Sequence, residues 1–321
     1  MERRILGATG ISVSEMALGA MMFGAGGNPD HDDSARVIHA ALDAGINLVD
    51  TSDVYSGGES EIIVGQAIKG RRDDVVLATK FCLPMGADPN QSGGSRRWIT
   101  RAVEDSLRRL GTDRIDLYQL HQPDPETPIP QTLAALDELV RAGKVREIGC
   151  SNFSAAQLRE AQAAVRDGAA RFVSVQNEYS LVQREPESEV LAECERQGLG
   201  FLPFFPLASG LLTGKYRRGA PMPAGTRLAG KSGFANRFLN QRNLALADAL
   251  ADFAARRGHS LLELAFSWLL SHRQVCSVIA GAISAEQVGA NVAAAGWRLT
   301  PDELAEVDEA SEIDRLAPPQ A

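Results

Sequence analysis

The stretch GINLVDTSDVY, residues 45–55, joins a short apolar run to a polar cluster. Ile46 to Val49 has the composition of a buried β-strand, and Asp50, Asp53 and Tyr55 follow it directly. In α/β proteins the loops at the carboxyl ends of buried parallel strands often carry the chemistry. The stretch therefore predicts either a catalytic cluster or a simple turn, and the rest of the chain must distinguish the two.

Length and composition limit the classes of protein that the chain can form. At 321 residues it exceeds an average domain, but a single barrel of alternating strands and helices commonly reaches this length. A hydrophobic share of 44% with 23% charged residues is typical of a globular protein with a large core. The 33 basic and 41 acidic residues give a net charge of −8 without a basic block, so nucleic acid is not an expected partner.

The cysteines and the amino-terminal sequence indicate in which cellular compartment the protein is expected. Cys82, Cys150, Cys194 and Cys276 lie far apart without a C-x-x-C pair, so their spacing predicts neither a zinc knuckle nor a disulfide framework. The start, MERRILGATG, lacks the apolar core of a signal peptide, and no stretch approaches the roughly 20 apolar residues of a membrane helix. We expect a cytoplasmic protein that does not interact with a membrane.

Short apolar runs alternate with helical patterns along the chain. The helical faces that end at Gly45 and Gly143 carry apolar residues at every third or fourth position, and Ser154 with Gln157 has the spacing of a capping box. Eight runs have the length and composition of buried strands, at residues 15–19, 47–50, 75–80, 115–120, 145–150, 172–177, 200–204 and 275–280.

This alternation predicts an α/β fold, a single (β/α)8 TIM barrel domain over residues 1–321, with an open doubly wound sheet as the alternative. The stretch RRILGATGISVS near the amino terminus predicts a β-hairpin that covers the bottom of the barrel. Thr300 with Glu303 has capping-box spacing and predicts extra helices at the carboxyl terminus. Residues 207–240 form one long connection, which we expect to be a cofactor or substrate loop within the barrel.

Motifs of other protein classes fail in this sequence. GAGGNP, residues 24–29, has a proline where the third glycine of a dinucleotide fingerprint belongs. GLLTGKY, residues 210–216, has too few residues between its glycines for a phosphate-binding P-loop. The five histidines show no metal-ligand spacing, so we expect no bound metal.

Four polar residues remain as a candidate site. Asp50, Lys80 and His121 follow or end three successive predicted strands, and Tyr55 comes five residues after Asp50. Each has a structural alternative, as a helix cap, a side chain that extends to solvent, a packed histidine or a loop anchor. Because the carboxyl ends of barrel strands share one face, the four side chains are expected to lie together there.

Beyond these four residues, the sequence resembles the aldo-keto reductases from about residue 4 to residue 291. The resemblance implies that the same four residues form a catalytic tetrad and that Asp53 is a turn residue. It rests on blocks in family order, which are GINLVDTSDVYSGGESE from residue 45, ATK at 78–80, LHQPD at 120–124, GKVREIGCSNF at 143–153, VQNEYS at 175–180 and FPLASGLLTGKY at 205–216.

The chemistry agrees with these implied roles. Hydride transfer to a carbonyl group creates an alkoxide, which needs a proton donor and positive charge nearby. Tyr55 would donate the proton, and the ammonium of Lys80 would lower a phenol pKa that is about 10 without perturbation. Asp50 would keep Lys80 charged and oriented, while His121 would orient the substrate oxygen as a hydrogen-bond donor.

The aldo-keto reductases bind a nicotinamide cofactor without a Rossmann turn, and the resemblance implies the contacts. Ser151, Asn152 and Gln176 would hold the carboxamide. Phe204 would stack on the nicotinamide ring, and Gly19 would permit close approach of the backbone. Each has a structural alternative as a turn former, a core residue or a helix cap. The other implied cofactor residues are Pro206, Leu207, Ser209, Leu211, Lys215, Gly281, Ser284, Gln287 and Asn291.

Two features depart from the common pattern of the family. Phe204 and Phe205 stand where tyrosine and serine are frequent, which keeps ring stacking but removes a hydroxyl contact. Gly281 and Ile283 stand where a basic residue often grips the adenosine 2′-phosphate. The resemblance still favours NADP(H), because most relatives use it, and leaves NAD(H) open. A basic residue from 207–240 that reaches the ribose would favour NADP(H).

The sequence thus predicts an NAD(P)-dependent oxidoreductase that reversibly reduces an aldehyde, ketone or sugar carbonyl, a small-molecule substrate, to the alcohol. One alternative is a cofactor-binding regulatory barrel that resembles the potassium-channel β subunits of the wider family. Another is a barrel hydrolase or lyase that uses Asp50 and Asp53. The loops at 21–28, 83–95 and 207–240 would select the substrate, while its identity and the oligomeric state stay open.

Overall fold

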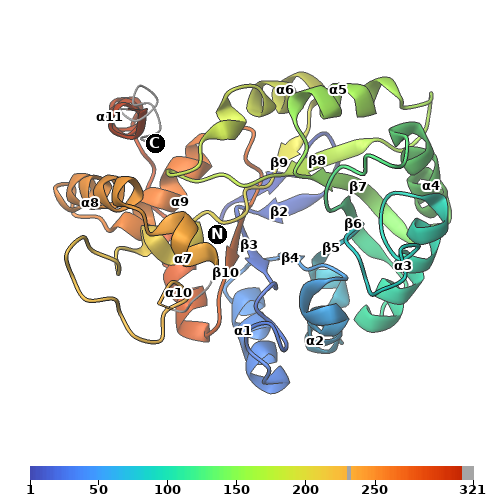
Figure 1. Cartoon of the computed structure of the whole chain (residues 1–321), viewed down its shortest axis with the longest axis horizontal. Helices are drawn as coiled ribbons and strands as arrows, with labels where there is room; N and C mark the ends of the chain where they lie inside the picture. Colours follow the sequence, from blue (N-terminus) through green and yellow to red (C-terminus); the bar gives the residue numbers. More distant parts are fainter. Residues whose placement is uncertain (230–232, 313–321) are drawn as a thin grey trace.

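The structure is a computed structural model that describes residues 1–229 and 233–312. Residues 230–232 of the predicted loop and 313–321 of the predicted domain lie outside the described residues. Eight parallel strands form one curved sheet surrounded by helices (Figure 1), which confirms the predicted α/β barrel fold. In spatial order they are β10 (Val278–Gly281), β3 (Met16–Gly19), β4 (Leu48–Asp50), β5 (Val76–Phe81), β6 (Ile115–Leu120), β7 (Val145–Ser151), β8 (Phe172–Gln176) and β9 (Gly200–Phe201).

The two outer strands of this sheet, β9 and β10, meet through the backbone around them. The amide of Phe201 donates to the carbonyl of Gln274 at 2.8 Å, and the amide of Cys276 donates to the carbonyl of Phe201 at 3.0 Å. The amide of Ile279 donates to the carbonyl of Pro203, also at 3.0 Å. This closure distinguishes the barrel from the open doubly wound sheet, because a closed sheet has no free edge.

A two-stranded antiparallel hairpin precedes the barrel, as predicted, with strands β1 (Arg3–Ile5) and β2 (Ser12–Ser14). Gly7 in its turn has φ +54°, and a Cβ there would lie 2.2 Å from the carbonyl oxygen of Val173, so the close contact requires glycine. Apolar hairpin side chains join the inward-facing residues at the lower end of the barrel in one cluster, which contains Leu6, Val13, Ala17, Leu48, Ala78, Leu117, Val173, Leu202, Cys276 and Ile279.

Helices follow the strands, and those for which the sequence contains a start or end signal begin or end there. The capping box at Ser154 and Gln157 is present, and the helices that precede Gly45 and Gly143 end at those positive-φ glycines. The helices are α1 (His31–Asp43), α2 (Glu59–Ala67), α3 (Arg96–Leu110), α4 (Ile129–Arg141), α5 (Ala155–Ala163), α6 (Val190–Gln197), α7 (Gly233–Phe238), α8 (Gln241–Ala255), α9 (Leu261–Ser271), α10 (Ala285–Ala294) and α11 (Pro301–Glu312). The described residues also contain four short 3₁₀ helices, which are η1 (Tyr55–Gly58), η2 (Arg72–Asp74), η3 (Glu185–Glu187) and η4 (Ala208–Thr213).

The extra carboxyl-terminal helix is α11, which packs against α8. The hydroxyl of Thr300 accepts the amide of Glu303 at 3.2 Å, and the carboxylate of Glu303 accepts the amide of Thr300 at 2.8 Å. This pair of bonds is the predicted capping box, which satisfies amides that the first turn of a helix leaves without partners.

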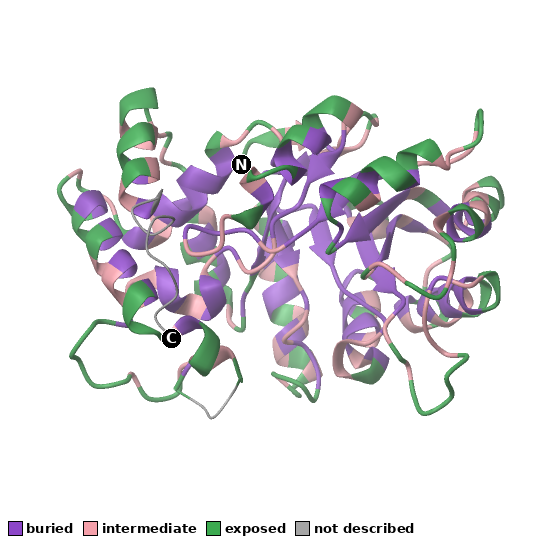
Figure 2. Cartoon of the chain, turned by 45° about the horizontal axis from the view of Figure 1, so that its top comes forward, coloured by how far each residue is buried: buried purple, intermediate pink, exposed green. Residues whose placement is uncertain are grey.

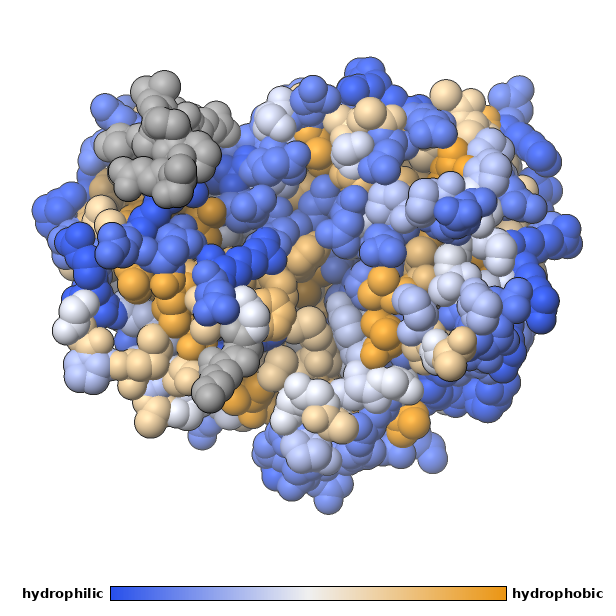
Figure 3. All heavy atoms as spheres, viewed as in Figure 1, coloured by the Kyte–Doolittle hydropathy of each residue, from blue (hydrophilic) through white to orange (hydrophobic). Residues whose placement is uncertain are grey.

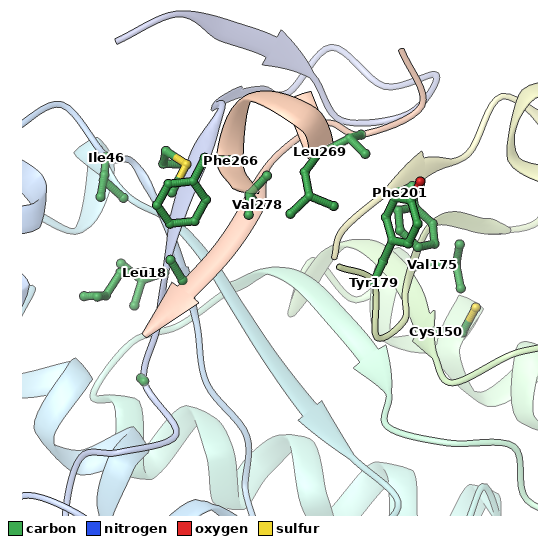
Figure 4. Packing of buried hydrophobic residues seen from close by; sticks show 14 of the residues in the cluster. Leu18, Ile46, Cys150, Val175, Tyr179, Phe201, Phe266, Leu269 and Val278 are labelled. Carbon is green, nitrogen blue, oxygen red and sulfur yellow. The ribbon is translucent and has the colours of Figure 1, made fainter. Parts of the chain in front are cut away.

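The main hydrophobic core lies between the barrel strands and the surrounding helices. Figure 2 shows buried strands and helices whose outer faces are exposed. Close by, Phe266 of α9 lies beside Val278 of β10 and near Leu18 of β3 (Figure 4), and all three side chains are buried. Figure 3 shows a mostly hydrophilic outer surface, with apolar residues gathered around a hollow near the middle of the face in view. This division follows from the burial of apolar surface, the main driving force of folding.

Two observations concern the environment of the chain. All four cysteines are buried and free, so the part of the chain that the structure describes contains no disulfide. Within residues 1–229 and 233–312, no helix combines the length and the apolar character needed to cross a membrane.

Candidate active site

The polar residues of the site occupy inward-facing positions at the carboxyl ends of adjacent strands. Side chains alternate between the two faces of a strand, so Ala78 and Lys80 of β5 face the barrel interior while Leu77 faces the helices. Lys80 pairs in register with Gln119 of β6, and Asp50 ends β4. The lower inward positions are apolar and the last ones are polar, so polar side chains gather at the carboxyl end of the barrel.

Lys80 and its hydrogen bonds form the centre of the site. Its Nζ lies 2.5 Å from Oδ2 of Asp50, 3.0 Å from the carbonyl oxygen of Thr51 and 3.2 Å from the hydroxyl of Tyr55. These contacts give each ammonium proton a partner. Burial lowers the pKa of Lys80, but the charge of Asp50 and the contacts with Tyr55 outweigh it and raise this pKa above its ordinary value. Lys80 therefore remains a charged ammonium inside the barrel.

Asp50 is held by two further side chains that the sequence places far away. Its Oδ1 accepts the amide of Gln119 at 3.0 Å and the amide of Gln176 at 2.9 Å. Sequence reasoning missed Gln119, although the alternation of β6 and its register beside Lys80 would have marked it as inward-facing. Both oxygens of this buried carboxylate are thus hydrogen-bonded, which keeps Asp50 fixed against Lys80.

Tyr55 reaches the site from η1, a turn after β4 in which Ser56, Gly57 and Gly58 all have positive φ. The ammonium of Lys80 also lies 5.0 Å from the centre of the Tyr55 ring. Burial raises the pKa of Tyr55 above its ordinary value, although Lys80 acts in the opposite direction. The predicted lowering by Lys80 is thus present but smaller than the effect of burial. Tyr55 keeps its proton at neutral pH.

His121 completes the predicted group of four. Its ring stands edge-on to the ring of Tyr55, with centroids 5.9 Å apart. Burial, together with the charge of Lys80, lowers the pKa of His121 to about 3, so the ring is neutral at neutral pH. Its Nδ1 lies 3.1 Å from the hydroxyl of Ser52, and its carbonyl oxygen accepts the amide of Asn152 at 2.9 Å.

The three residues predicted to hold the carboxamide lie directly beside this group. Ser151 and Gln176 are paired in register on β7 and β8, and the Ser151 hydroxyl donates to the Gln176 carbonyl at 2.7 Å. Asn152 has φ +61°, a turn conformation, and its side chain also donates to the Ser151 hydroxyl at 3.1 Å. Ser151 and Gln176 are buried, whereas Asn152 is exposed and available to a ligand.

The residues predicted around the phosphates lie in or near η4. Ser209 has φ +57°, and its buried hydroxyl has no hydrogen-bond partner among the described residues. A Cβ added to Gly210 would lie 3.2 Å from Nζ of Lys215, so this ammonium lies against the η4 backbone. Leu211 is fully buried in the core, so its side chain packs inside the protein. Among the others, Pro206 is buried, and Leu207 and Phe204 are half-buried.

The remaining predicted cofactor residues come from β3, β10 and α10. Gly19 pairs with Gly281, and a Cβ on Gly19 would lie 2.9 Å from Cγ2 of Ile279. The hydroxyl of Ser284 accepts the amide of Gln287 at 3.3 Å and caps α10, which is the structural alternative named above. Asn291 of the same helix is buried.

Arg227 is a cation that sequence reasoning did not single out. Its guanidinium lies 5.5 Å from the ring centre of Phe205 and 5.0 Å from that of Phe234. Within residues 1–229 and 233–312 no carboxylate pairs with it, and burial lowers its pKa. Its only sequence signal was its position as a basic residue in the loop at 207–240.

Three further residues near the site are buried and lie outside the predicted tetrad. Asp53 lies in a turn, as predicted, but its side chain is fully buried, and burial and the charge of Glu61 raise its pKa to about 7. Cys82 and Cys150 are buried as well, and burial raises the pKa of both thiols, to about 12 for Cys82. Thiols of this kind stay protonated and are poor nucleophiles, so both side chains serve as packing residues.

Comparisons with known proteins identify the family of the chain. The family model described as Aldo/keto reductase family covers residues 15–312. A versiconal hemiacetal acetate reductase of Aspergillus parasiticus is 33% identical, and the alignment covers 96% of this chain and 96% of the relative. An L-glyceraldehyde 3-phosphate reductase of Escherichia coli (strain K12) is 31% identical, with 96% and 92% covered. A probable voltage-gated potassium channel subunit beta of Oryza sativa subsp. japonica is 37% identical, with 92% and 91% covered.

The match begins just before β3 and ends with α11, so it contains the whole barrel and every residue of the predicted tetrad. The named reductases among the relatives agree with a protein that reduces carbonyl groups. The chain is therefore an oxidoreductase and belongs to the Aldo/keto reductase family.

Proposed function

We propose that this chain reduces the carbonyl group of an aldehyde, ketone or sugar to the alcohol, reversibly and with NADP(H), and that Tyr55 donates the proton. The reduced nicotinamide supplies the hydride when it is bound. One observation carries the proposal. The Tyr55 hydroxyl lies 3.2 Å from the Lys80 ammonium, which is itself held 2.5 Å from the Asp50 carboxylate.

The proposed proton transfer follows from this charge arrangement. Tyr55 keeps its proton at neutral pH, because its pKa is raised by burial, and it donates that proton as negative charge develops on the substrate oxygen. The phenolate that remains is stabilised by the adjacent ammonium of Lys80. Asp50 keeps Lys80 charged and in place throughout. His121, neutral and edge-on to Tyr55, orients the substrate oxygen.

The side chains in the segment 204–227 suit a nucleotide cofactor. Ser209 has a buried hydroxyl without a partner in the described part of the chain, and Lys215 and Arg227 supply two cations. Phosphate groups are the ligands that such hydroxyls and cations recognise. We assign these three residues to the cofactor phosphates and Phe204 to the nicotinamide ring. The loop at 207–240 then acts as the cofactor and substrate loop.

NADP(H) is proposed over NAD(H) because Arg227 of the loop can supply a positive charge for the 2′-phosphate. Residues 281 and 283, where the family often has a basic residue, are uncharged here. Arg227 is half-buried without a carboxylate partner among the described residues, which suits a ligand that brings its own negative charge. Asn152 is the exposed amide beside the tetrad and is assigned to the carboxamide. The other predicted cofactor residues are proposed to bind the cofactor through their backbone groups or to support the residues that contact it.

The test measures the loss of reduced-nicotinamide absorbance when the purified protein meets a reactive aromatic aldehyde, with NADPH and NADH in parallel. Tyr55→Phe is expected to reduce kcat by a hundredfold or more while cofactor affinity changes little. Tyr118→Phe is the matched control, because the buried Tyr118 hydroxyl has no partner in residues 1–229 and 233–312. Full activity of Tyr55→Phe would overturn the proton-donor assignment.

The comparison with potassium-channel β subunits supplies the alternative outcome. Tight binding of NADPH without turnover of aromatic aldehydes, ketones or sugars would favour a cofactor-binding regulator over an enzyme. Faster turnover with NADH than with NADPH would contradict the cofactor assignment alone.

A further inference from the structure

Ser52 and Asp53 link His121 to a buried carboxyl group that the proposed mechanism does not use. The hydroxyl of Ser52 lies 3.1 Å from Nδ1 of His121 and 3.2 Å from Oδ1 of Asp53. Ser52 and Asp53 are both fully buried. The second carboxyl oxygen, Oδ2 of Asp53, is buried without a hydrogen-bond partner in the described residues. The three residues thus form one hydrogen-bond chain that ends at the catalytic face.

The Ser52 hydroxyl has too few protons to donate in both directions. It offers one hydrogen and two lone pairs, and it also accepts the amide of Val54 at 3.4 Å. Ser52 must therefore donate to one of its two neighbours and accept from the other. Because His121 is neutral across the ordinary pH range, its single ring proton lies on either Nδ1 or Nε2. The direction in which Ser52 donates its hydrogen bond decides which ring nitrogen carries the proton.

We infer that Ser52 and Asp53 are positioning residues that set the tautomer of His121 through this reversible hydrogen-bond chain. An ionised Asp53 accepts from Ser52, so Ser52 accepts the Nδ1 proton of His121 and leaves Nε2 as a bare lone pair. A protonated Asp53 donates to Ser52, which then donates to Nδ1 and leaves the ring proton on Nε2. The inference rests on the proposed function, in which His121 faces the substrate oxygen.

The buried, unpartnered oxygen fixes where the proton of Asp53 resides. A proton on Oδ2 would be a buried donor without an acceptor, which is costly. A proton on Oδ1 has the Ser52 oxygen as its acceptor, so this position is favoured. When Asp53 is protonated, it therefore donates to Ser52, and Ser52 donates to His121. The opposite direction of these hydrogen bonds is then excluded.

The surroundings of Asp53 bring its titration into the ordinary pH range. Burial and the negative charge of Glu61 raise its pKa to about 7, while the hydrogen bond from Ser52 and the charge of Arg109 oppose this rise. Glu61 is itself ion-paired to Arg109 at 2.6 Å. The charged and titratable groups that act on Asp53, or on which it acts, are Tyr55, Glu61, Cys82, Arg109 and Tyr118.

The tautomer matters because the two ring nitrogens have different roles. Nδ1 is bound to Ser52, so Nε2 is the ring nitrogen left for a substrate oxygen. Both a carbonyl and the alkoxide formed from it are acceptors, so they are stabilised by an Nε2 proton and opposed by a lone pair. Carbonyl reduction should therefore require a protonated Asp53. Above pH 7, kcat/KM for reduction should fall about tenfold per pH unit.

The direct test is ¹⁵N NMR of the histidine rings in the whole protein, without substrate or cofactor, between pH 5.5 and 9. His121→Asn assigns the signal. We expect the ring proton to move from Nε2 to Nδ1 with a midpoint near pH 7 in the wild type. A single tautomer of the His121 ring over this range would overturn the inference.

Three variants test whether Ser52 and Asp53 set the tautomer of His121 or only support the fold. Ser52→Ala should abolish the pH dependence of the tautomer, and Ser52→Thr, which keeps the hydroxyl, should restore it. Asp53→Asn, which does not ionise, should hold one tautomer at every pH. A pH-dependent tautomer in Ser52→Ala would contradict the inference.

The kinetic arm uses the same variants and keeps the two proposals apart. Kinetic profiles of aldehyde reduction should lose the limb near pH 7 in Ser52→Ala and regain it in Ser52→Thr. Tyr55 cannot supply that limb, because its pKa is raised above its ordinary value. A tautomer change without any turnover would contradict the proposed function alone. Turnover with a fixed tautomer would contradict the inference alone.

Discussion

Nζ of Lys80 lies 2.5 Å from Oδ2 of Asp50, and both side chains are buried at the carboxyl end of the barrel. The other oxygen of Asp50 accepts two amides, so this ion pair is fully hydrogen-bonded. A buried pair of this kind depends on both partners, because removal of one leaves an uncompensated charge inside the protein.

Asp50→Asn tests this dependence. It leaves the Lys80 ammonium buried without its counter-ion, so we expect a loss of about 3–5 kcal/mol in the free energy of unfolding, measured by urea denaturation. The exposed pair of Arg273 and Glu195 provides the control, since Arg273→Ala is expected to change stability by less than about 1 kcal/mol. Equal effects of the two substitutions would show that Asp50 contributes no more than a surface charge.

Lys80→Met tests the effect of the ammonium on Tyr55. Lys80 lowers the pKa of Tyr55 against the effect of burial, so its removal should raise that pKa further. In the alcohol-oxidation direction Tyr55 must accept a proton as the phenolate, and activity should therefore move to higher pH and fall by orders of magnitude. The measurement is kcat/KM for alcohol oxidation against pH. A pH profile that does not shift would show that Lys80 does not affect the pKa of Tyr55.

Asp53→Asn should stabilise the protein at alkaline pH. In the folded protein the pKa of Asp53 is raised from 3.8 to about 7, so the folded state keeps a proton that the unfolded chain has released. The stability contributed by this proton is complete below about pH 4 and is lost as the pH rises to about 7. The variant avoids this loss, which corresponds to about 4 kcal/mol at pH 8.

Urea denaturation at pH 4 and pH 8 checks this prediction. The difference in the free energy of unfolding between the wild type and Asp53→Asn should be small at pH 4 and large at pH 8. Asp43→Asn is the control, because Asp43 is an exposed carboxylate paired with Arg71, and its removal should change little at either pH. A difference that does not grow with pH would contradict the raised pKa of Asp53.

Arg227→Gln tests the proposed phosphate contact. Loss of a charged hydrogen bond costs about 1.5–3 kcal/mol, so the Kd for NADPH should rise at least about tenfold. An equal loss for NADH would assign Arg227 to the pyrophosphate, and a larger loss for NADPH would assign it to the 2′-phosphate. Arg218→Gln, an exposed arginine of the same loop, is the matched control. An unchanged affinity for both cofactors would exclude Arg227 from the site.

Much of the fold could be predicted from local patterns. Apolar runs marked the eight strands, and the box at Ser154 and Gln157 marked the start of α5. Such signals depend on side chains a few residues apart, where helix and strand geometry sets which positions share a face. The alternation of strands and helices then limited the topology to few arrangements, since parallel neighbours need crossover connections.

The candidate site was predicted only in part. Strand ends and the resemblance placed Asp50, Lys80 and Tyr55 at one face, and the structure brings them within hydrogen-bond reach. The burial of Asp53 was not predicted, because nothing in its immediate neighbours indicates that its carboxyl group is enclosed. In the structure Glu61 of α2 and Arg109 of α3 lie close enough to act on its pKa, and the local sequence does not describe that proximity.

By itself, the sequence determined the order of strands and helices, the barrel that this order favours and the residue types at its strand ends. Only the tertiary structure decided the state of those residues, since Asp50 and Gln176 are 126 positions apart in sequence and 2.9 Å apart in space. Burial and long-range hydrogen bonds set which groups hold protons, as in Lys80, His121 and Asp53. The physical reason is that pKa depends on desolvation and on nearby charges, and both are properties of the folded chain.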